Sequence, residues 1–346
     1  MTTITDIAKA CGTSKATVSK IMNGNDLKIS AGTRKRVMEA VRRLDYQPSA
    51  MARGLSMKRA NTIGIVTPNV WHILSLTYYA TLIGAILDEA RNNEQTVSVF
   101  NSKVWAKDAP DHLVFADGRC DGLVLVGVWD ERLMPALQKA RIPFVLLNGG
   151  AGPEGAYSID IDNFDTAAEI TRYLIAQGHK RIAYFDCGEA RDFAHRRFAG
   201  YRSALAEAGI RYEPMLVFDG PPLYESAYDR GRQVASRTGL GITALFCASD
   251  LIALAAMRGL QDSGLRVPDD VSVVGINGII DGDRSSPRLT TVTQSLDTLG
   301  AEAVRLLLDV IEGRDAAPRH VVWPTMLIER DSVAAPAGAS IELACK

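Results

Sequence analysis

Short apolar segments of strand length recur between residues 63 and 276, and helical stretches separate most of them. A strand, a helix and a further strand in succession form a parallel unit, and repeated units build a parallel sheet that helices cover on both faces. Nine such segments exceed the usual size of one sheet, so the pattern predicts two linked α/β lobes. They are Ile63–Val66, Val97–Phe100, Leu123–Val126, Phe144–Leu147, Ile159–Ile161, Ile182–Phe185, Leu216–Phe218, Ala244–Cys247 and Val271–Ile276.

Four predicted helices in this region are followed by a glycine, which is a common way for a helix to end. They are Thr166–Ala176, Phe198–Ala208, Leu251–Gln261 and Leu296–Ile311. Open parallel sheets bind ligands beyond the carboxyl ends of their strands. We therefore expect a ligand in the crevice between the two lobes.

The first sixty residues differ in charge from the rest of the chain. They carry twelve Lys and Arg but only four Asp and Glu, a net charge of +8, whereas the remaining residues sum to −9. A basic segment on an acidic body is typical of a polyanion-binding module attached to a domain with another task. A solvated, charged helix surface would give the same charge, so the pattern inside the segment has to decide.

That pattern predicts three short helices. Thr3 and Asp6 form a capping box that begins the first helix, Gly12 suits a turn with positive φ, and Ser14 caps a second helix that ends at Met22. A helix, a tight turn and a helix form the helix-turn-helix design, whose second helix enters the DNA major groove. A third helix, capped by Ser30 or Thr33, closes the core; its apolar residues are Val37, Val41 and Leu44, and they face Ile7, Val18 and Ile21.

The second helix presents several side chains away from this core. Lys15, Ala16 and Lys20 face outward, with Thr17 and Ser19 beside them. Lysine can donate to guanine, alanine can contact a thymine methyl group, and hydroxyls can bind phosphate. A generic α-hairpin is the alternative interpretation, and the basic surplus disfavours it.

Residues 48–60 predict a hinge. Pro48 ends the preceding helix, and Ser49 can cap a short helix that runs to Leu55. Gly54 destabilises that helix by ~1 kcal/mol relative to alanine, and so short a helix does not persist alone. We expect this segment to become ordered only on DNA; the alternative is an ordinary linker with Leu55 packed on the body.

Other features exclude several classes of protein. The first residues lack the basic and apolar regions of a signal peptide, and no apolar stretch approaches the ~20 residues that cross a bilayer. Five scattered cysteines without a C-x-x-C pair indicate the reducing cytoplasm. There is no phosphate-binding glycine loop or G-x-S-x-G, and the five histidines lack zinc-ligand spacing. We therefore expect no enzyme, no catalytic residues, no cofactor and no metal.

The order of residues in the basic segment is similar to that of a known family. Thr3-Ile4-x-Asp6-Ile7-Ala8-x-x-Cys11-Gly12-Thr13-Ser14-x-x-Thr17-Val18-Ser19-x-x-x-Asn23 resembles the start of LacI/GalR-type transcriptional repressors, and Tyr46-x-Pro48-Ser49-x-x-Ala52-Arg53-x-Leu55 resembles their hinge. The departures are Cys11, Thr13 and Ser49. Similar motifs, such as Gly178-His179-x-Arg181 and Val267-Pro268, continue to about residue 333.

This resemblance implies a fold class and a division of the chain. A small all-α helix-turn-helix head precedes an α/β body of two lobes with parallel sheets, similar to periplasmic binding proteins. The expected domains are a DNA-binding head (1–47), a hinge helix and linker (48–60), an effector-binding and dimerisation domain (61–333) and a flexible tail (334–346). The implied DNA-binding residues are Thr3, Ser14, Lys15, Ala16, Thr17, Ser19, Lys20, Asn23, Ala52 and Leu55, with Leu55 wedging into the minor groove.

The resemblance also implies effector-binding residues in the body. The expected set is Trp129, Asp162, Phe193, Arg197, Ser249 and Asn277, and residues 69–79 correspond to the family's other ligand loop. Arg197 suits ligand hydroxyls or carboxylates, and Asn277 replaces a usual aspartate, which favours a more polar or anionic ligand. The alternatives are a structural ion pair for Arg197, a helix cap for Asp162 or for Ser249-Asp250, and ordinary packing for the aromatics.

The sequence therefore predicts a cytoplasmic, homodimeric, ligand-responsive repressor that binds double-stranded operator DNA and a small carbohydrate-like effector, with no membrane. Control by a protein co-regulator or by a non-sugar metabolite is the first alternative. A sugar-transport binding module and an enzyme built on the two-lobed body are the other two. The sequence leaves open the effector, the operator, induction or co-repression, and dimer or tetramer.

Overall fold

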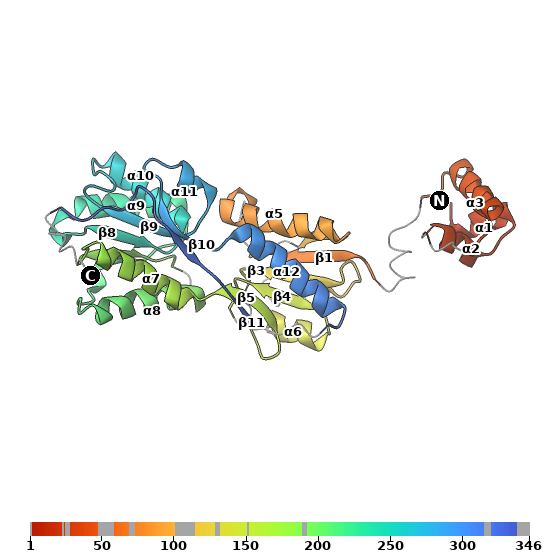
Figure 1. Cartoon of the computed structure of the whole chain (residues 1–346), viewed down its shortest axis with the longest axis horizontal. Coiled ribbons are helices and arrows are strands. Elements are labelled where there is room, and N and C mark those ends of the chain that lie inside the picture. The colour runs from red at the N-terminus through yellow and green to blue at the C-terminus, as the bar shows by residue number, and fades with distance from the viewer. Residues whose placement is uncertain are drawn as a thin grey trace, which may run out of the picture. The chain divides into compact units, whose positions relative to one another are not determined.

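Figure 1 shows the computed structural model of the chain. The structure describes residues 2–22, 24, 28–47, 59–68, 73–100, 115–128, 132–150, 152–188, 192–314 and 320–337. The chain divides into two compact units, Met1–Thr62 with Gly118–Cys120, and Ile63–Asp117 with Asp121–Lys346. We call the three-helix part of the first unit the head and the second unit the body.

The head contains the three predicted helices, α1 (Ile4–Cys11), α2 (Lys15–Met22) and α3 (Ala31–Arg43). Gly12 has φ 61° and ψ 41°, the left-handed conformation that its place between α1 and α2 requires. Ser30 is the cap of α3, because its side chain accepts from the Thr33 N–H. The buried core consists of Ile7, Ala8, Cys11, Val18, Ile21, Val37 and Ala40, with Val41 and Leu44 packed against it.

The first lobe of the body, lobe one, is built on a six-stranded sheet of order β11-β5-β4-β3-β1-β2. Helices α5 (Thr77–Asn92) and α12 (Leu296–Ile311) pack together, and α12 contacts β3 and β4. The shorter α6 (Leu133–Lys139) lies beside β4 (Figure 1). The strands are β1 (Thr62–Val66), β2 (Thr96–Phe100), β3 (Gly122–Val126), β4 (Phe144–Leu147), β5 (Tyr157–Ile161) and β11 (His320–Trp323).

The second lobe, lobe two, has a six-stranded sheet of order β12-β10-β9-β8-β6-β7. Its strands pair in parallel except β12, which is antiparallel to β10. The strands are β6 (Ile182–Phe185), β7 (Val217–Phe218), β8 (Ala244–Cys247), β9 (Ser272–Asn277), β10 (Thr290–Thr293) and β12 (Met326–Ile328). The helices are α7 (Asn163–Ala176), α8 (Asp192–Glu207), α9 (Tyr224–Ser236), α10 (Asp250–Asp262) and α11 (Ile280–Arg284).

The two-lobed parallel architecture is confirmed, and all nine predicted strands are present. The sequence did not predict β10, β11 and β12: β10 (Thr-Thr-Val-Thr) is mostly threonine, and β11 and β12 are edge strands with only three consecutive apolar residues each. These strands matter for the topology: the chain passes between the lobes after β5, after β10 and after β11. Helix α8 begins at Asp192, six residues earlier than predicted, because its first turns are polar.

The predicted hinge and tail lie largely outside the described residues, so the domain boundaries stay predictions. One residue assigned to the tail, Ala334, is bonded to the body: its N–H donates to Ser272 Oγ, and its carbonyl accepts from the same hydroxyl, both at 3.0 Å. Within the described ranges, no helix is both long and apolar enough to cross a membrane, and no cluster of three His, Cys, Asp or Glu side chains could hold a metal ion.

Candidate DNA-binding and effector sites

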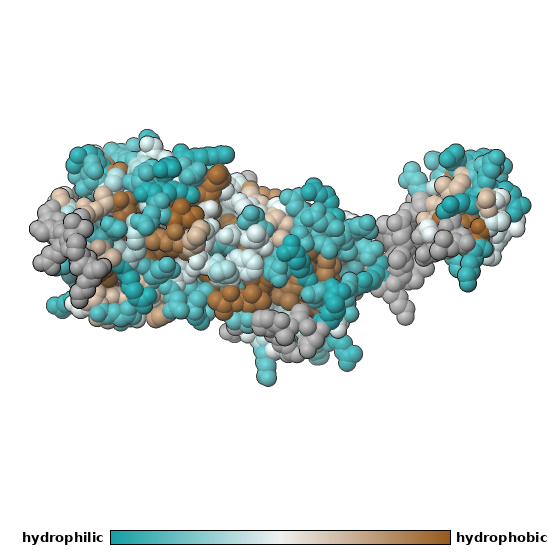
Figure 2. Space-filling view, in the orientation of Figure 1, coloured by the Kyte–Doolittle hydropathy of each residue, from teal (hydrophilic) through white to brown (hydrophobic). Residues whose placement is uncertain are grey.

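The outer side of α2 is the candidate DNA-reading surface. Lys15, Ala16 and Lys20 are exposed, and Thr17 and Ser19 are half-buried beside them. The opposite side of α2 contributes Val18 and Ile21 to the core of the head, which fixes the orientation of the helix. Hydrophilic residues predominate on the visible face of the head (Figure 2). The structure therefore brings the predicted α2 residues together on one accessible helix face.

Two predicted DNA contacts are hydroxyls that also cap helices. Thr3 Oγ1 accepts from the Asp6 N–H at 3.4 Å, and the Thr3 N–H donates to Asp6 Oδ2 at 2.9 Å, which completes the capping box of α1. This bonding with Thr3 lowers the pKa of Asp6. Ser14 Oγ accepts from the Thr17 N–H at 3.1 Å at the start of α2. Asn23, Ala52 and Leu55 lie outside the described residues.

In the body, Arg197 is the buried centre of a chain of polar contacts. It lies on α8 with 7% of its surface exposed. Its Nε donates to Asn163 Oδ1 at 2.8 Å, and its Nη1 donates to the Ala248 carbonyl at 2.5 Å. Phe193, one turn earlier on α8, lies with its ring centroid 5.1 Å from the Arg197 guanidinium carbon. Within the described residues, the partners of this guanidinium are neutral oxygens rather than the carboxylate of a structural ion pair.

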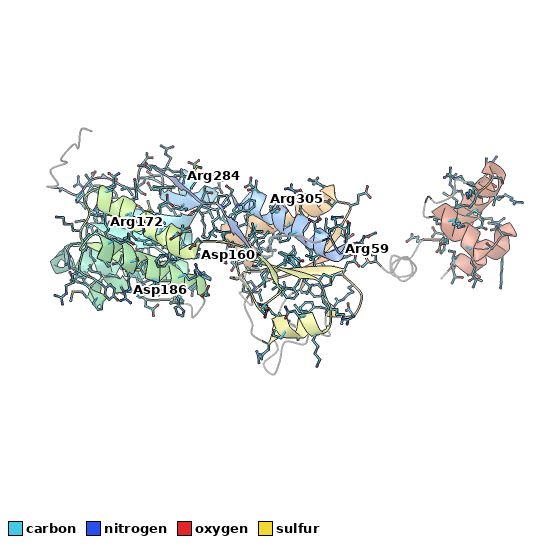
Figure 3. All side chains as sticks on the ribbon, turned by 60° about the horizontal axis from the view of Figure 1, so that its bottom comes forward. Arg59, Asp160, Arg172, Asp186, Arg284 and Arg305 are labelled. Carbon is cyan, nitrogen blue, oxygen red and sulfur yellow. The ribbon has the colours of Figure 1, made fainter. Side chains whose placement is uncertain are left out.

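The chain of contacts continues to Asp160 near the end of β5, a residue that was not among the predicted site residues. Asn163 Nδ2 donates to Asp160 Oδ1 at 3.2 Å, and the Gly150 N–H donates to Asp160 Oδ2 at 2.8 Å. Burial raises the pKa of Asp160, against these hydrogen bonds and the charge of Arg197. Figure 3 places Asp160 where the two lobes meet. The carboxylate thus joins a lobe-one loop to the first residue of α7 and, through it, to Arg197.

The predicted residues Asp162 and Ser249 both begin helices of lobe two. Asp162 Oδ1 accepts from the N–H groups of Phe164 and Asp165, both at 3.0 Å, and caps α7. Burial alone would raise the pKa of Asp162, but the backbone bond from Asp165 and the charge of Arg196 outweigh it and lower the pKa. Ser249 Oγ accepts from the Ile252 N–H at 3.3 Å and caps α10. The capping alternative therefore holds for both side chains.

Asn277 at the end of β9 takes part in a line of amides that joins the lobes. Its Oδ1 accepts from Gln294 Nε2 at 3.0 Å, and Gln294 Oε1 accepts from Asn148 Nδ2 at 3.1 Å. The Asn148 amide also donates to the Tyr78 hydroxyl. Asn148 and Asn277 have φ angles of 52° and 133°, which side chains with a Cβ seldom adopt. Strained, polar backbone positions of this kind gather at functional sites.

Sequence reasoning missed Asn148 and Gln294. Asn148 directly follows the predicted strand β4, so its position at a carboxyl end was a usable signal. Gln294 follows β10, which the apolar pattern did not reveal. Asn148 Oδ1 is buried and, among the described residues, has no hydrogen-bond partner, so it can accept from a ligand hydroxyl. The remaining predicted residue, Trp129, lies outside the described residues.

Comparison with known proteins shows the family. The profile "Bacterial regulatory proteins, lacI family" matches residues 3–49, and the profile "Periplasmic binding protein-like domain" matches residues 171–333. The HTH-type transcriptional regulator CelR of Thermobifida fusca is 34% identical over 337 residues, which cover 95% of this chain and 98% of CelR. This chain belongs to the LacI family. Its head is therefore a helix-turn-helix DNA-binding domain, and the chain is an effector-binding transcription regulator.

Two solved structures of LacI-family proteins each match most of the chain. The lac repressor dimer bound to operator and the anti-inducer ONPF has a TM-score of 0.83 and 29% identity, covering 96% of this chain and 99% of that chain. The complex of the regulator CelR with cellobiose has a TM-score of 0.72 and 30% identity, covering 96% of this chain and 100% of that chain. The resemblance read from the sequence is confirmed, and these relatives are regulators rather than enzymes.

Proposed function

We propose that this LacI-family protein is a cytoplasmic repressor that binds a pseudo-palindromic operator as a homodimer and takes a sugar or sugar-acid-like effector between its lobes. The observation that carries the proposal is the exposed Lys15, Ala16 and Lys20 face of α2 on a rigid three-helix core. The lac repressor is a dimer on its operator, and CelR is complexed with cellobiose. Their similarity to this chain supports the same assembly and ligand class.

On DNA, each part of the head has a separate task. Lys15 and Lys20 donate to base edges in the major groove, Ala16 contacts a thymine methyl group, and the hydroxyls of Thr17 and Ser19 bind phosphate. The caps Thr3 and Ser14 place their helix N-termini, with unbonded N–H groups, toward the phosphates. Asn23 adds a further contact to the operator, and Ala52 and Leu55 act in the minor groove. Two heads of one dimer read successive major grooves.

In the body, the effector binds beside the two series of hydrogen bonds that contain Arg197 and Asn277. Arg197 and Asn277 supply hydrogen bonds, as do Asp162 and Ser249 through Asp162 Oδ2 and the Ser249 O–H, the parts of these side chains that their helix caps do not use. Phe193 and Trp129 pack on the apolar face of a sugar ring. Arg197 and Asn277 belong to separate chains of contacts that each reach lobe one, so a ligand that bonds to them changes how the lobes are held. The effector regulates repression by binding with different affinity to two arrangements of the lobes, one that binds operator well and one that binds it poorly.

A DNA-binding experiment tests the role of α2. Selection from a random duplex library with the full-length chain supplies an operator, and Lys15→Ala is then compared with wild type on operator and on random DNA. Loss of one base-reading side chain costs about 1–3 kcal/mol on the operator and little on random DNA. The matched control is Lys9→Ala, which removes another exposed charge, from α1. Equal losses on both DNAs would contradict base reading by Lys15.

A thermal unfolding experiment tests the effector. The full-length chain is heated with sugars, sugar acids and nucleosides in turn. At 100 times its dissociation constant, a ligand adds ~2.7 kcal/mol to the free energy of unfolding and raises the melting temperature by several degrees. A shift with sugars or sugar acids supports the proposal. A shift with nucleosides alone, or with none of the panel, favours the alternative of a non-sugar metabolite or a protein co-regulator.

A further inference from the structure

Ile279 belongs to lobe two by sequence but packs in lobe one. It directly follows β9 and the turn at Gly278, and 6% of its surface is exposed. Its side chain is a member of the lobe-one core, together with residues such as Ile63 and Leu299. We call residues 277–279 the interlobe plug. The position of this turn therefore sets where lobe two is held against lobe one.

The plug is held by a buried carboxylate. Asp250, the first residue of α10, has no exposed surface. Its Oδ2 accepts from the Ile279 N–H at 2.9 Å, and its Oδ1 accepts from the Thr291 hydroxyl on β10 at 2.6 Å. Gly275 makes room for this carboxylate, because a Cβ there would lie 2.2 Å from Asp250 Oδ1. One carboxylate thus ties α10, the plug and β10 together.

Asp250 is not needed to cap its own helix. Ser249 performs that task through its bond from the Ile252 N–H. Both oxygens of Asp250 accept instead from groups outside α10. These groups are the Ile279 N–H of the plug and the Thr291 hydroxyl of β10. A buried carboxylate is costly unless donors surround it, so its presence beside a turn whose Ile279 side chain packs in lobe one calls for a role beyond helix stability.

The plug is also joined to the candidate effector site. Asn277 is its first residue and bonds to Gln294, which in turn bonds to Asn148 of lobe one. Gly278 cannot be replaced without displacement, because a Cβ there would lie 2.5 Å from Thr293 Oγ1. The turn therefore has little freedom to change unless its anchors change. A ligand that competes for the Asn277 amide acts on the same turn that Asp250 holds at the Ile279 N–H.

We propose that Asp250 is a positioning residue whose carboxylate fixes the interlobe plug, and that the plug transmits effector binding between the lobes. The second part rests on the proposed function, since it requires an effector at Asn277. The first part concerns the lobe junction alone. Coupling of this kind needs an element on which both lobes act, and a turn seated in one lobe and bonded to the other is such an element.

The test measures the distance between the lobes in the full-length chain without effector. The exposed residues Asp88 on α5 and Arg232 on α9 are each replaced by a non-native amino acid that carries a spin label. Pulsed electron paramagnetic resonance then gives the distribution of distances between the two labels. Asp250→Ala leaves the Ile279 N–H and the Thr291 hydroxyl without an acceptor, so the single narrow distance peak of the parent is lost. Asp250→Asn restores the peak, because its amide accepts from Ile279 and donates to the Thr291 hydroxyl.

Two further variants keep the result decisive. Ile279→Ala removes the plug side chain but leaves the carboxylate bonded, and it should broaden the distribution like Asp250→Ala. Ile252→Ala is the matched control: it truncates a fully buried α10 residue in the lobe-two core, lowers the melting temperature and leaves the distance unchanged. A parent-like peak in folded Asp250→Ala and Ile279→Ala, or equal broadening in Ile252→Ala, would overturn the proposal.

Operator titrations of the same variants separate this inference from the proposed function. With the effector found by thermal unfolding, Asp250→Ala should bind operator equally well with and without ligand, and Asp250→Asn should keep the wild-type ratio. If wild type binds neither operator nor any panel ligand, the proposed function fails while the distance measurement still decides the role of Asp250.

Discussion

Lys15 and Lys20 on α2 are exposed, whereas Arg197 on α8 is buried and bonded to Asn163 and the Ala248 carbonyl. Removing either lysine from the head therefore leaves the buried core of the head unchanged. Removing Arg197 from the body leaves protein groups without partners. The comparison teaches that the exposed side chains of α2 can change with little cost to the fold, whereas buried polar side chains such as Arg197 also hold the body together.

The largest expected effect concerns how closely the body is packed. A Cβ at Gly200 on α8 would lie 2.2 Å from the Phe164 carbonyl of α7, and backbone atoms cannot rotate aside. We expect Gly200→Ala to lower the free energy of unfolding of the body by about 3 kcal/mol or more. Gly239→Ala, where nothing lies within 4 Å, is the control. Gly12 in the head also has open surroundings but a positive φ. Gly12→Ala should therefore lower the free energy of unfolding of the head by ~1–2 kcal/mol, through backbone strain alone.

The pH dependence of stability also distinguishes the two regions. Burial raises the pKa of Asp250 to about 6, against the hydrogen bonds from Thr291 and Ile279. Because the folded-state value lies above the unfolded one, Asp250 stabilises the body most at low pH, and this contribution is lost as the pH rises through about 6. Between about pH 4 and pH 7.5, the stability difference between Asp250→Asn and wild type should change by up to about 3 kcal/mol.

Asp6 in the head should behave in the opposite way. The hydrogen bonding with Thr3 lowers the pKa of Asp6, so the stability it contributes is present above the unfolded value and is lost as the pH falls through the folded one. Urea unfolding of Asp6→Asn and Asp250→Asn at several pH values measures both slopes. Slopes of the same sign would contradict the contrast between the capping carboxylate and the buried one.

Arg197→Ala should reduce both stability and effector binding. The change leaves Asn163 Oδ1 and the Ala248 carbonyl unsatisfied in a buried place, which costs about 2 kcal/mol. The thermal shift caused by the effector should disappear as well. Lys15→Ala changes the free energy of unfolding by less than about 0.5 kcal/mol. Thermal unfolding of both variants with and without effector makes the comparison, and an unchanged ligand shift in Arg197→Ala would remove this residue from the proposed site.

The smallest effect is expected at the cap of the DNA-reading helix. Ser14→Ala removes the acceptor for the Thr17 N–H and should destabilise the head by about 1 kcal/mol. Operator affinity should fall with it, because Ser14 also lies beside the phosphates in the proposed complex. Ser14→Asp keeps the cap but adds a negative charge, so it should recover stability and still bind DNA poorly. Circular dichroism and operator titration together check both parts.

The sequence by itself determined the parts of the protein that depend on local signals. Capping residues, the glycine at the first turn and the apolar spacing of α1 to α3 predicted the head, because each helix is fixed by residues within a few positions of one another. The alternation of apolar runs and helices predicted two parallel-sheet lobes for the same reason. The outward face of α2 followed from its inward face, so the candidate DNA-reading residues could be chosen before the structure was known.

The tertiary structure decided which polar residues meet. Asn148, Gln294 and Asn277 are far apart in the sequence and become neighbours only because two sheets end at the same junction. Asp162 and Ser249 could bind a ligand or cap a helix, and the structure shows the caps. Ile279 has no sequence mark of a residue that crosses between lobes. Long-range contacts of this kind depend on chain topology, which local propensity does not encode.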